Sequence, residues 1–123
     1  MPSGISSFNP PSLHKFSSTP YQIGTFEGHP MYEVVLNTVL PTSSGGNISG
    51  FTIAGKTIVK VSGINKLESG SIVGWQQIPY QTLNTSFINF WCDTINLRCN
   101  FGTDDVNYSA GKPTILLIRY YTS

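Results

Sequence analysis

The sequence predicts an all-β fold, an antiparallel β-sandwich or barrel preceded by an extended N-terminal segment. Short runs of β-branched and aromatic residues recur along the 123 residues, and turn signals rich in Gly (12) and Pro (8) separate them. No stretch keeps a helical period over several turns. Short strands with frequent turns pack in globular proteins as a sandwich or a closed barrel. A chain of this length forms one domain and can bury a core.

The N-terminal residues 1–19 are expected to form a linker or neck, and residues 20–123 the folded domain. Ser and Pro dominate the first segment, no apolar period is visible, and Pro10-Pro11 favours extended polyproline geometry. Its isolated apolar side chains can dock on a neighbouring surface; these are Ile5, Phe8, Leu13 and Phe16.

A hairpin is expected next, with a strand at residues 21–27, a turn cluster at 27–30 and a longer strand at 31–40. One face of the longer strand should line the core, and it carries Tyr32, Val34, Leu36 and Leu40. The opposite face carries Glu33, Val35, Asn37 and Val39. Residues 41–50 are expected to form a polar loop.

Further short strands and loops are expected in the middle of the chain. In order they are strands at 51–53 and 57–61 about a turn at 54–56, a loop at 63–71, a strand at 72–80 that Pro79 closes, a hairpin of 82–94 with 97–101, and a polar loop at 102–112.

The clearest strand signal is the last, at residues 113–121. Alternation places Thr114, Leu116, Ile118 and Tyr120 on one face and Ile115, Leu117, Arg119 and Tyr121 on the other. Both faces are apolar in the middle of the run. One face can line a core, and the other needs cover from a second sheet or a neighbouring subunit.

Composition narrows the possible partners. Only 11% of residues are charged and the formal net charge is +1, with no basic run, so nucleic acid is not the expected partner. No stretch reaches the roughly 18 apolar residues of a membrane helix, and no N-terminal secretion signal is visible. We therefore expect no membrane insertion.

Two interpretations of the cysteines, Cys92 and Cys99, stay open. If residues 87–93 and 97–101 pair about a tight turn, the two thiols could face each other and form a disulfide. Alternatively, they are buried thiols that behave as small hydrophobic side chains. The missing secretion signal favours the second interpretation.

No motif for catalysis, metal binding or a cofactor is found. The two histidines, His14 and His29, fall in the expected neck and in a turn, and no zinc-ligand spacing is present. A glycosidase needs two carboxylates that flank the scissile bond, but the acidic residues form no recognisable pair. Asp104 and Asp105 are adjacent in a loop, where they are either a solvated tip or hydrogen-bonding groups for a sugar or a cation. We expect no enzyme.

Aromatic residues crowd the second half of the chain. Phe90 and Trp91 are neighbours on an expected strand, so one should point inward and the other outward or toward an interface. An exposed Trp beside Asp and Asn side chains can cover the apolar face of a sugar while the polar groups bind its hydroxyls. Trp91 therefore has two interpretations, a core or interface residue and a ligand contact.

Two segments of the sequence resemble segments found in bacteriophage tail-fibre and receptor-binding tip domains. Residues 23–35 read Ile-Gly-Thr-Phe-Glu-Gly-His-Pro-Met-Tyr-Glu-Val-Val, and residues 118–122 read Ile-Arg-Tyr-Tyr-Thr. The likeness spans roughly residues 20–123. This chain departs from the usual pattern at His29, where Lys is common, and at its end, which lacks the Lys and Asp common there.

The resemblance implies a homotrimeric head at the distal end of a tail fibre, tailspike or baseplate, in a virion assembled in the host cytoplasm. Such heads attach to the bacterial surface, commonly through a cell-wall or capsular saccharide. Residues 1–19 would join other tail or fibre proteins. Tyr120 and Tyr121 are then expected near the edge of the sheet, and Arg119 and Tyr121 at the trimer interface.

The saccharide contacts are predicted from chemistry, among the loops at residues 41–50, 65–71 and 102–112. The predicted stacking platform is Trp91 or Tyr108, and the predicted polar partners are Asp104, Asp105 and Asn107. Three other functions stay open: a trimerisation cap without receptor binding, a depolymerase fragment, and a cellular lectin-like module.

Overall fold

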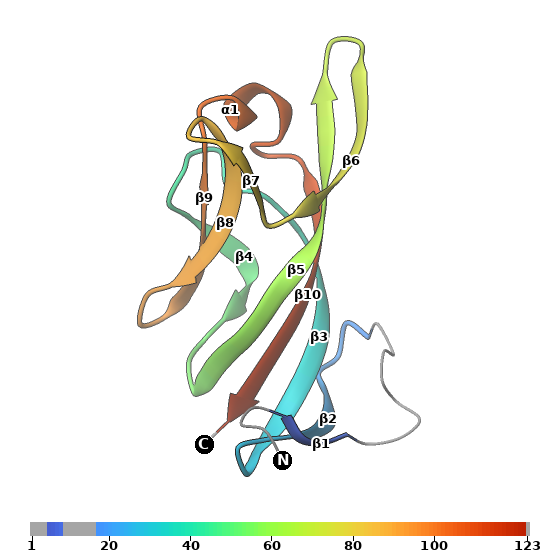
Figure 1. Cartoon of the computed structure of the whole chain (residues 1–123), viewed down its shortest axis with the longest axis vertical. Coiled ribbons are helices and arrows are strands. Elements are labelled where there is room, and N and C mark those ends of the chain that lie inside the picture. Colours follow the sequence, from blue (N-terminus) through green and yellow to red (C-terminus); the bar gives the residue numbers. More distant parts are fainter. Residues whose placement is uncertain (1–4, 9–16, 123) are drawn as a thin grey trace.

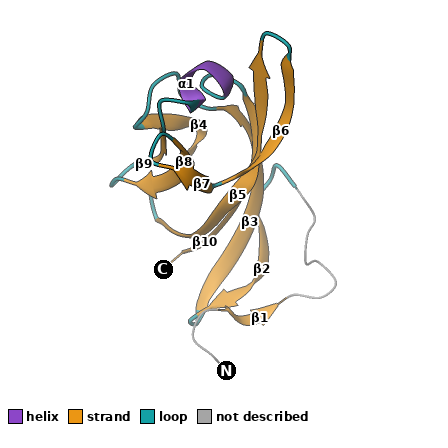
Figure 2. Cartoon of the chain, turned by 45° about the horizontal axis from the view of Figure 1, so that its top comes forward, coloured by secondary structure: helices purple, strands orange, loops and turns teal. Residues whose placement is uncertain are grey.

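The computed structural model describes residues 5–8 and 17–122, which form two antiparallel sheets packed face to face (Figure 1, Figure 2). The elements are β1 (Ile5–Phe8), β2 (Tyr21–Phe26), β3 (His29–Val39), β4 (Gly46–Thr52), β5 (Lys56–Ser69), β6 (Ile72–Ile78), β7 (Tyr80–Leu83), β8 (Ser86–Cys92), β9 (Asn96–Phe101), α1 (Asp105–Tyr108) and β10 (Pro113–Thr122). The expected all-β sandwich is confirmed. The expected neck lies mostly outside the described residues, and the described part of it includes strand β1.

The larger sheet has the strand order β1-β2-β3-β10-β5-β6. The predicted hairpin of β2 and β3 is present and turns at Glu27 and Gly28, both of which have positive φ angles (50° and 83°). Two successive positive φ values suit the twist of a two-residue hairpin turn, and glycine adopts them without steric cost.

Strand β10 lies inside this sheet, between β3 and β5. Tyr120 is opposite Tyr32 on one side and Ile58 on the other. The expectation that Tyr120 and Tyr121 lie near the sheet edge is therefore wrong. A strand that is apolar on both faces is most stable in the interior of a sheet, where neighbouring strands also bind the backbone groups of both its edges.

The smaller sheet has the order β4-β9-β8-β7. The hairpin of β8 and β9 is confirmed. The loop expected at residues 41–50 is shorter, because β4 begins at Gly46, which pairs with Cys99 of β9. The strands expected at 51–53 and 57–61 do not pair with each other: β4 lies in the smaller sheet and β5 in the larger one.

Strand β5 is longer than expected and replaces the loop predicted at residues 63–71. It continues to Ser69, paired with β10 on one edge and with β6 on the other. Gly63, expected to begin that loop, instead marks a close approach between two strands. A Cβ atom at this position would lie 1.9 Å from the carbonyl oxygen of Ile115, so only glycine fits.

The core lies between the two sheets. Leu116, Ile118 and Tyr120 of β10 point into it, as predicted. The buried residues of this core are Val34, Leu40, Ile48, Ile78, Ile88, Leu97, Cys99, Phe101, Leu116, Ile118 and Tyr120. Burying each large apolar side chain contributes about 1.5–3 kcal/mol, so this cluster is a main source of fold stability.

The chain crosses between the sheets at Pro79, which separates β6 from β7 and closes the strand as predicted. The polar loop expected at 102–112 contains the single turn of α1. Helix α1 and the turn between β5 and β6 lie at one end of the molecule, and the C-terminus of β10 lies at the opposite end (Figure 1). Among the described residues, no helix is long and apolar enough to span a membrane.

Candidate functional site

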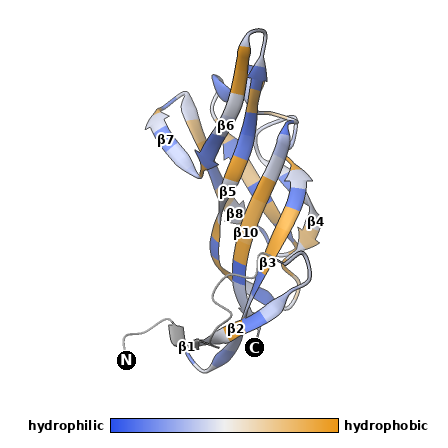
Figure 3. Ribbon diagram, turned by 90° about the vertical axis from the view of Figure 1, so that its right-hand side faces the viewer, coloured by the Kyte–Doolittle hydropathy of each residue, from blue (hydrophilic) through white to orange (hydrophobic). Residues whose placement is uncertain are grey.

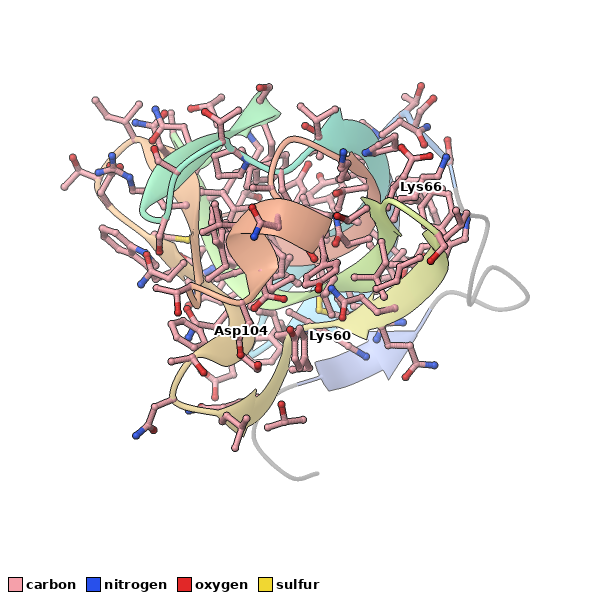
Figure 4. All side chains as sticks on the ribbon, turned by 90° about the horizontal axis from the view of Figure 1, so that it is seen from above. Lys60, Lys66 and Asp104 are labelled. Carbon is pink, nitrogen blue, oxygen red and sulfur yellow. The ribbon has the colours of Figure 1, made fainter. Side chains whose placement is uncertain are left out.

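A cleft of about 280 Å³ lies at the end of the sandwich that carries α1. Figure 4 looks onto this end, with α1 toward the viewer and Asp104 labelled. The cleft is bordered by the α1 segment, the β5–β6 hairpin and the start of β7 and β8, and its lining residues are Leu67, Ile72, Gln76, Tyr80, Ser86, Asp104, Asp105 and Tyr108. Two of the three residue ranges predicted as loops, 65–71 and 102–112, therefore line one cleft, although Leu67 of the first range lies in strand β5.

Asp104 presents a charged carboxylate to this cleft. Its Oδ2 atom accepts hydrogen bonds from Ser86 Oγ (2.5 Å) and Thr85 Oγ1 (2.9 Å), and its backbone N–H donates to the Thr85 carbonyl (2.9 Å). The Ser86 and Thr85 hydroxyls lower the pKa of Asp104 below its ordinary value, because they stabilise the charged form. Since Asp104 is exposed and only Oδ2 is bonded within the described residues, Oδ1 can accept a hydrogen bond from a ligand.

Asp105 has a different environment although it is adjacent in sequence. Its exposure is 3%, and its oxygens accept hydrogen bonds from the Tyr80 hydroxyl and from the Phe87 N–H (3.1 Å). Burial, followed by the hydrogen bond to Asp105, raises the pKa of Tyr80 strongly. Asp105 thus joins α1 to β7 and β8 and holds the cleft wall in place. Of the two aspartates, only Asp104 lies at a solvated loop tip.

A buried polar network supports the other side of the cleft. Gln76 Nε2 donates to Ser109 Oγ (3.0 Å) and to Asn65 Oδ1 (3.3 Å), and Asn65 Nδ2 donates to Thr114 Oγ1 (3.0 Å). The network ties the β5–β6 hairpin to the segment after α1. Sequence reasoning missed Gln76, and the only available signal was a polar residue in an otherwise apolar strand.

The remaining residues of the loop take different positions. Tyr108 is half-buried and lines the cleft together with the apolar side chains of Leu67 and Ile72. Asn107 is exposed and is not among the lining residues. The structure therefore brings Asp104, Asp105 and Tyr108 to one cleft and leaves Asn107 outside it.

Trp91 lies elsewhere, on the outer face of the smaller sheet. Phe90 packs against the core, and Trp91 points outward with 41% exposure, so the predicted inward and outward pair is confirmed. The Trp91 Nε1–H donates to Asn100 Oδ1 (2.9 Å), and the Arg98 guanidinium lies 5.3 Å from the ring centroid. Trp91 is five positions along β8 from Ser86 at the cleft, which is about 16 Å along a strand.

The residues predicted at a trimer interface have partners within this chain. Arg119 Nε donates to Glu33 Oε2 (2.8 Å), and the Glu33 side chain is fully buried. Tyr121 stacks on the rings of Phe26 and His29, with centroid distances of 5.3 and 5.2 Å. Both residues lie on the face of β10 that points away from the core.

The two cysteines are free thiols, Cys92 exposed and Cys99 buried. The register places Cys92 opposite Leu97 and Cys99 opposite Phe90, so the cysteines do not face each other across the hairpin. Burial raises the pKa of Cys99 to about 12. In the part of the chain that the structure describes, no group of three or more His, Cys, Asp or Glu side chains is placed to hold a metal ion.

Comparisons of the chain with protein-family models, with curated proteins and with solved structures find no match.

Proposed function

We propose that this protein is a non-enzymatic receptor-binding head of a bacteriophage tail fibre or baseplate, and that it binds a bacterial surface saccharide in the cleft beside α1. The observation that carries the proposal is the position and lining of this cleft. It lies at the α1 end of the molecule, opposite the C-terminus of β10 (Figure 1). Its lining combines Tyr108 with the charged, partly unpaired carboxylate of Asp104, which is labelled in Figure 4. The sequence resemblance to tail-fibre tip domains supplies the biological setting.

The lining fits the chemistry of a sugar. The Tyr108 ring and the side chains of Leu67 and Ile72 offer apolar surface for the carbon-rich face of a pyranose. Asp104 Oδ1 can accept a hydrogen bond from a sugar hydroxyl, and such charge-assisted bonds are roughly twice as strong as neutral ones. The cleft volume of about 280 Å³ falls just below the roughly 300–1,000 Å³ of most ligand pockets, which favours a single sugar unit.

The environments of the two carboxylates in the cleft favour binding over cleavage. Asp105 is buried, and its oxygens already accept hydrogen bonds from the Tyr80 hydroxyl and the Phe87 N–H, so this carboxylate is engaged within the chain. A hydrolase of the usual kind needs both carboxylates at the scissile bond. A homotrimer would compensate for a weak single site, because three tethered sites can raise avidity by roughly 10²–10⁴-fold.

The test is binding of the purified protein to a panel of bacteria and to a glycan array. We expect Asp104→Asn and Tyr108→Ala each to weaken binding by roughly tenfold, since a charge-assisted hydrogen bond contributes about 1.5–3 kcal/mol. Matched controls are Asn107→Ala, beside the cleft, and Trp91→Ala, on the outer face of the smaller sheet. Unchanged binding in both cleft variants, or a loss confined to Trp91→Ala, would rule out this cleft as the receptor site.

A second candidate function is a trimerisation cap without receptor binding. The exposed apolar side chains on the outer face of the larger sheet, Val39, Trp75 and Ile115 among them, favour it. A trimer that binds no bacterial cells, and whose removal disrupts fibre assembly, would support the cap over the receptor-binding head.

A further inference from the structure

A second cavity, a groove of about 340 Å³, lies between β5 and β8 on the side of the sandwich where the chain crosses at Pro79. It is lined by residues 58–61 of β5, residues 89–92 of β8, Pro79 and Leu97. Successive side chains of a strand point to opposite faces, so four consecutive residues can line one groove only where the backbone edge of the strand borders it. The groove therefore lies between two strand edges.

Neither of these edges has a neighbouring strand among the residues that the structure describes. Strand β6 pairs with β5 only from Gly63 to Ser69, and β7 pairs with β8 only as far as Ile88. The reason is the crossing at Pro79: the chain leaves the larger sheet at Ile78 and enters the smaller sheet at Tyr80, so neither β6 nor β7 continues along the groove.

The hydrogen-bond pattern identifies which backbone groups point into the groove. The Gly102 N–H donates to the Phe87 carbonyl (3.0 Å), so the odd-numbered residues of β8 bond toward β9. The even-numbered residues bond toward the other side, where β7 ends its pairing at Ile88. Phe90 and Cys92 thus present their N–H and C=O groups to the groove, and no strand of the described chain pairs with them.

The two edges differ in how they resist pairing. The edge of β5 carries the exposed Lys60 and a bulge at Val59, which the pairing with β10 skips. A lysine and a bulge both discourage a further strand. Residues 89–92 of β8 contain no charge and no Pro, and their register with β9 is unbroken. The edge of β8 is therefore the one open to strand addition.

We propose that an extended segment of a partner protein adds as a strand to residues 89–92 of β8, as in other complexes formed by β-augmentation. The groove determines the chemistry of this segment. One side chain faces the apolar residues Ile58, Val61 and Leu97, which line the groove. An acidic side chain faces Lys60, because no carboxylate lines the groove and no ion pair of Lys60 is present among the described residues.

Charge in the larger sheet favours the same acidic partner. Lys60 is opposite Arg119 on β10, and Arg119 already bonds to Glu33. Lys60 and Arg119 together carry two positive charges, and Glu33 compensates only one of them. A carboxylate that arrives from the groove side would compensate the charge of Lys60.

The first test uses the peptide acetyl-Val-Glu-Val-Glu-Val-amide as a probe on ¹⁵N-labelled protein. We expect saturable shifts of the amide signals of residues 89–92 at millimolar peptide, and slower hydrogen exchange at the amides of Phe90 and Cys92. No saturation, or shifts confined to other strands, would overturn the proposal. Protection of the same amides without peptide, rising with protein concentration, would show that a second copy occupies the edge and would also overturn it.

The second test reverses the charge. Lys60→Glu should lower the affinity for the acidic probe and raise the affinity for the matching peptide with Lys in place of Glu. Each change should be roughly two- to fivefold, as expected for one solvent-accessible ion pair. The matched control is Lys66→Glu. Lys66 lies on the same strand, apart from Lys60 in Figure 4, and it pairs with Glu68 beside β6 rather than with the groove. Equal effects of the two variants would contradict a local role of Lys60.

Discussion

The two outer faces of the sandwich differ in composition. The outer face of the larger sheet exposes large apolar side chains, namely Val39, Ile64, Val73, Trp75 and Ile115. Figure 3 views the molecule from this side, and hydrophobic residues run along β3, β10, β5 and β6. On the outer face of the smaller sheet, polar side chains surround Trp91; they are Asn47, Asn89, Arg98 and Asn100.

The difference shows which face has its exposed side chains already bonded to one another within a single chain. On the smaller sheet, side chains bind one another: Trp91 donates to Asn100, and Arg98 pairs with Asp93. On the larger sheet, no second sheet of the described residues covers the exposed apolar positions, because the core lies on the opposite face. Large exposed apolar patches on soluble proteins commonly mark interaction sites. We therefore expect subunit contacts on the larger sheet and solvent at the smaller one.

The largest effect is expected where the outer face of the larger sheet buries charge. Arg119→Met should destabilise the fold by about 3–5 kcal/mol, because it removes the guanidinium that pairs with the fully buried carboxylate of Glu33. Urea unfolding measures this, and the double variant with Glu33→Gln should recover much of the loss. A cost below about 1 kcal/mol would show that the pair is not desolvated.

This ion pair also changes how the interface prediction can be tested. Replacing Arg119 by Glu would place two carboxylates together inside one chain, so dissociation of an oligomer would report unfolding. Tyr121 has the same difficulty, because it stacks on Phe26 and His29. An exposed apolar residue of the same face is the better probe.

The second-largest effect is expected on the assembly of subunits into an oligomer. Ile115 is 37% exposed in the middle of the outer face, so Ile115→Glu should leave the monomer folded and reduce a trimer to monomers. Light scattering after size exclusion gives the mass, and circular dichroism checks the fold. Asn89→Glu, on the smaller sheet, is the matched control and should keep the mass of the unchanged protein. An unchanged mass for Ile115→Glu, or a monomer before any substitution, contradicts an interface on this face.

The sequence predicts those features that depend on local alternation. The core face of β10, the β2–β3 and β8–β9 hairpins, and the outward position of Trp91 next to the inward Phe90 all follow from period-two patterning. Strand β5 could not be predicted in full, because Gly63 and Asn65 look like loop residues. Their reasons are distant in sequence: the close approach to Ile115 and the network with Gln76.

The candidate site was predictable only where its residues are close together in the sequence. Asp104 and Tyr108 lie together because one short loop carries both, whereas Trp91 is separated from them by the length of β8. Nothing in two adjacent aspartates tells which one is buried. Asp105 is buried because Tyr80 and the Phe87 N–H meet it, and this contact depends on the folded arrangement of α1, β7 and β8.

The smallest effect is expected at the β8–β9 turn, where the outer face of the smaller sheet is already self-paired. The N–H groups of Asn96 (2.6 Å) and Ile95 (2.7 Å) bond to Asp93 Oδ1, and Arg98 bonds to Oδ2 (3.2 Å). These contacts, that of Asn96 foremost, lower the pKa of Asp93 below its ordinary value. A lowered folded-state pKa adds stability above the ordinary pKa of about 3.9, and this stability is lost as pH falls through the folded value.

Asp93→Asn should therefore lower the melting temperature slightly at pH 6, and the difference from the unchanged protein should shrink as pH falls toward 2. Differential scanning calorimetry across this range measures it. Asp104→Asn is the matched comparison, since hydroxyls lower its pKa in the same direction at the other end of β8. A difference that grows as pH falls would mean that the Asp93 carboxylate does not hold the turn. In that case, the pairing of Trp91 and Arg98 alone would have to orient this face.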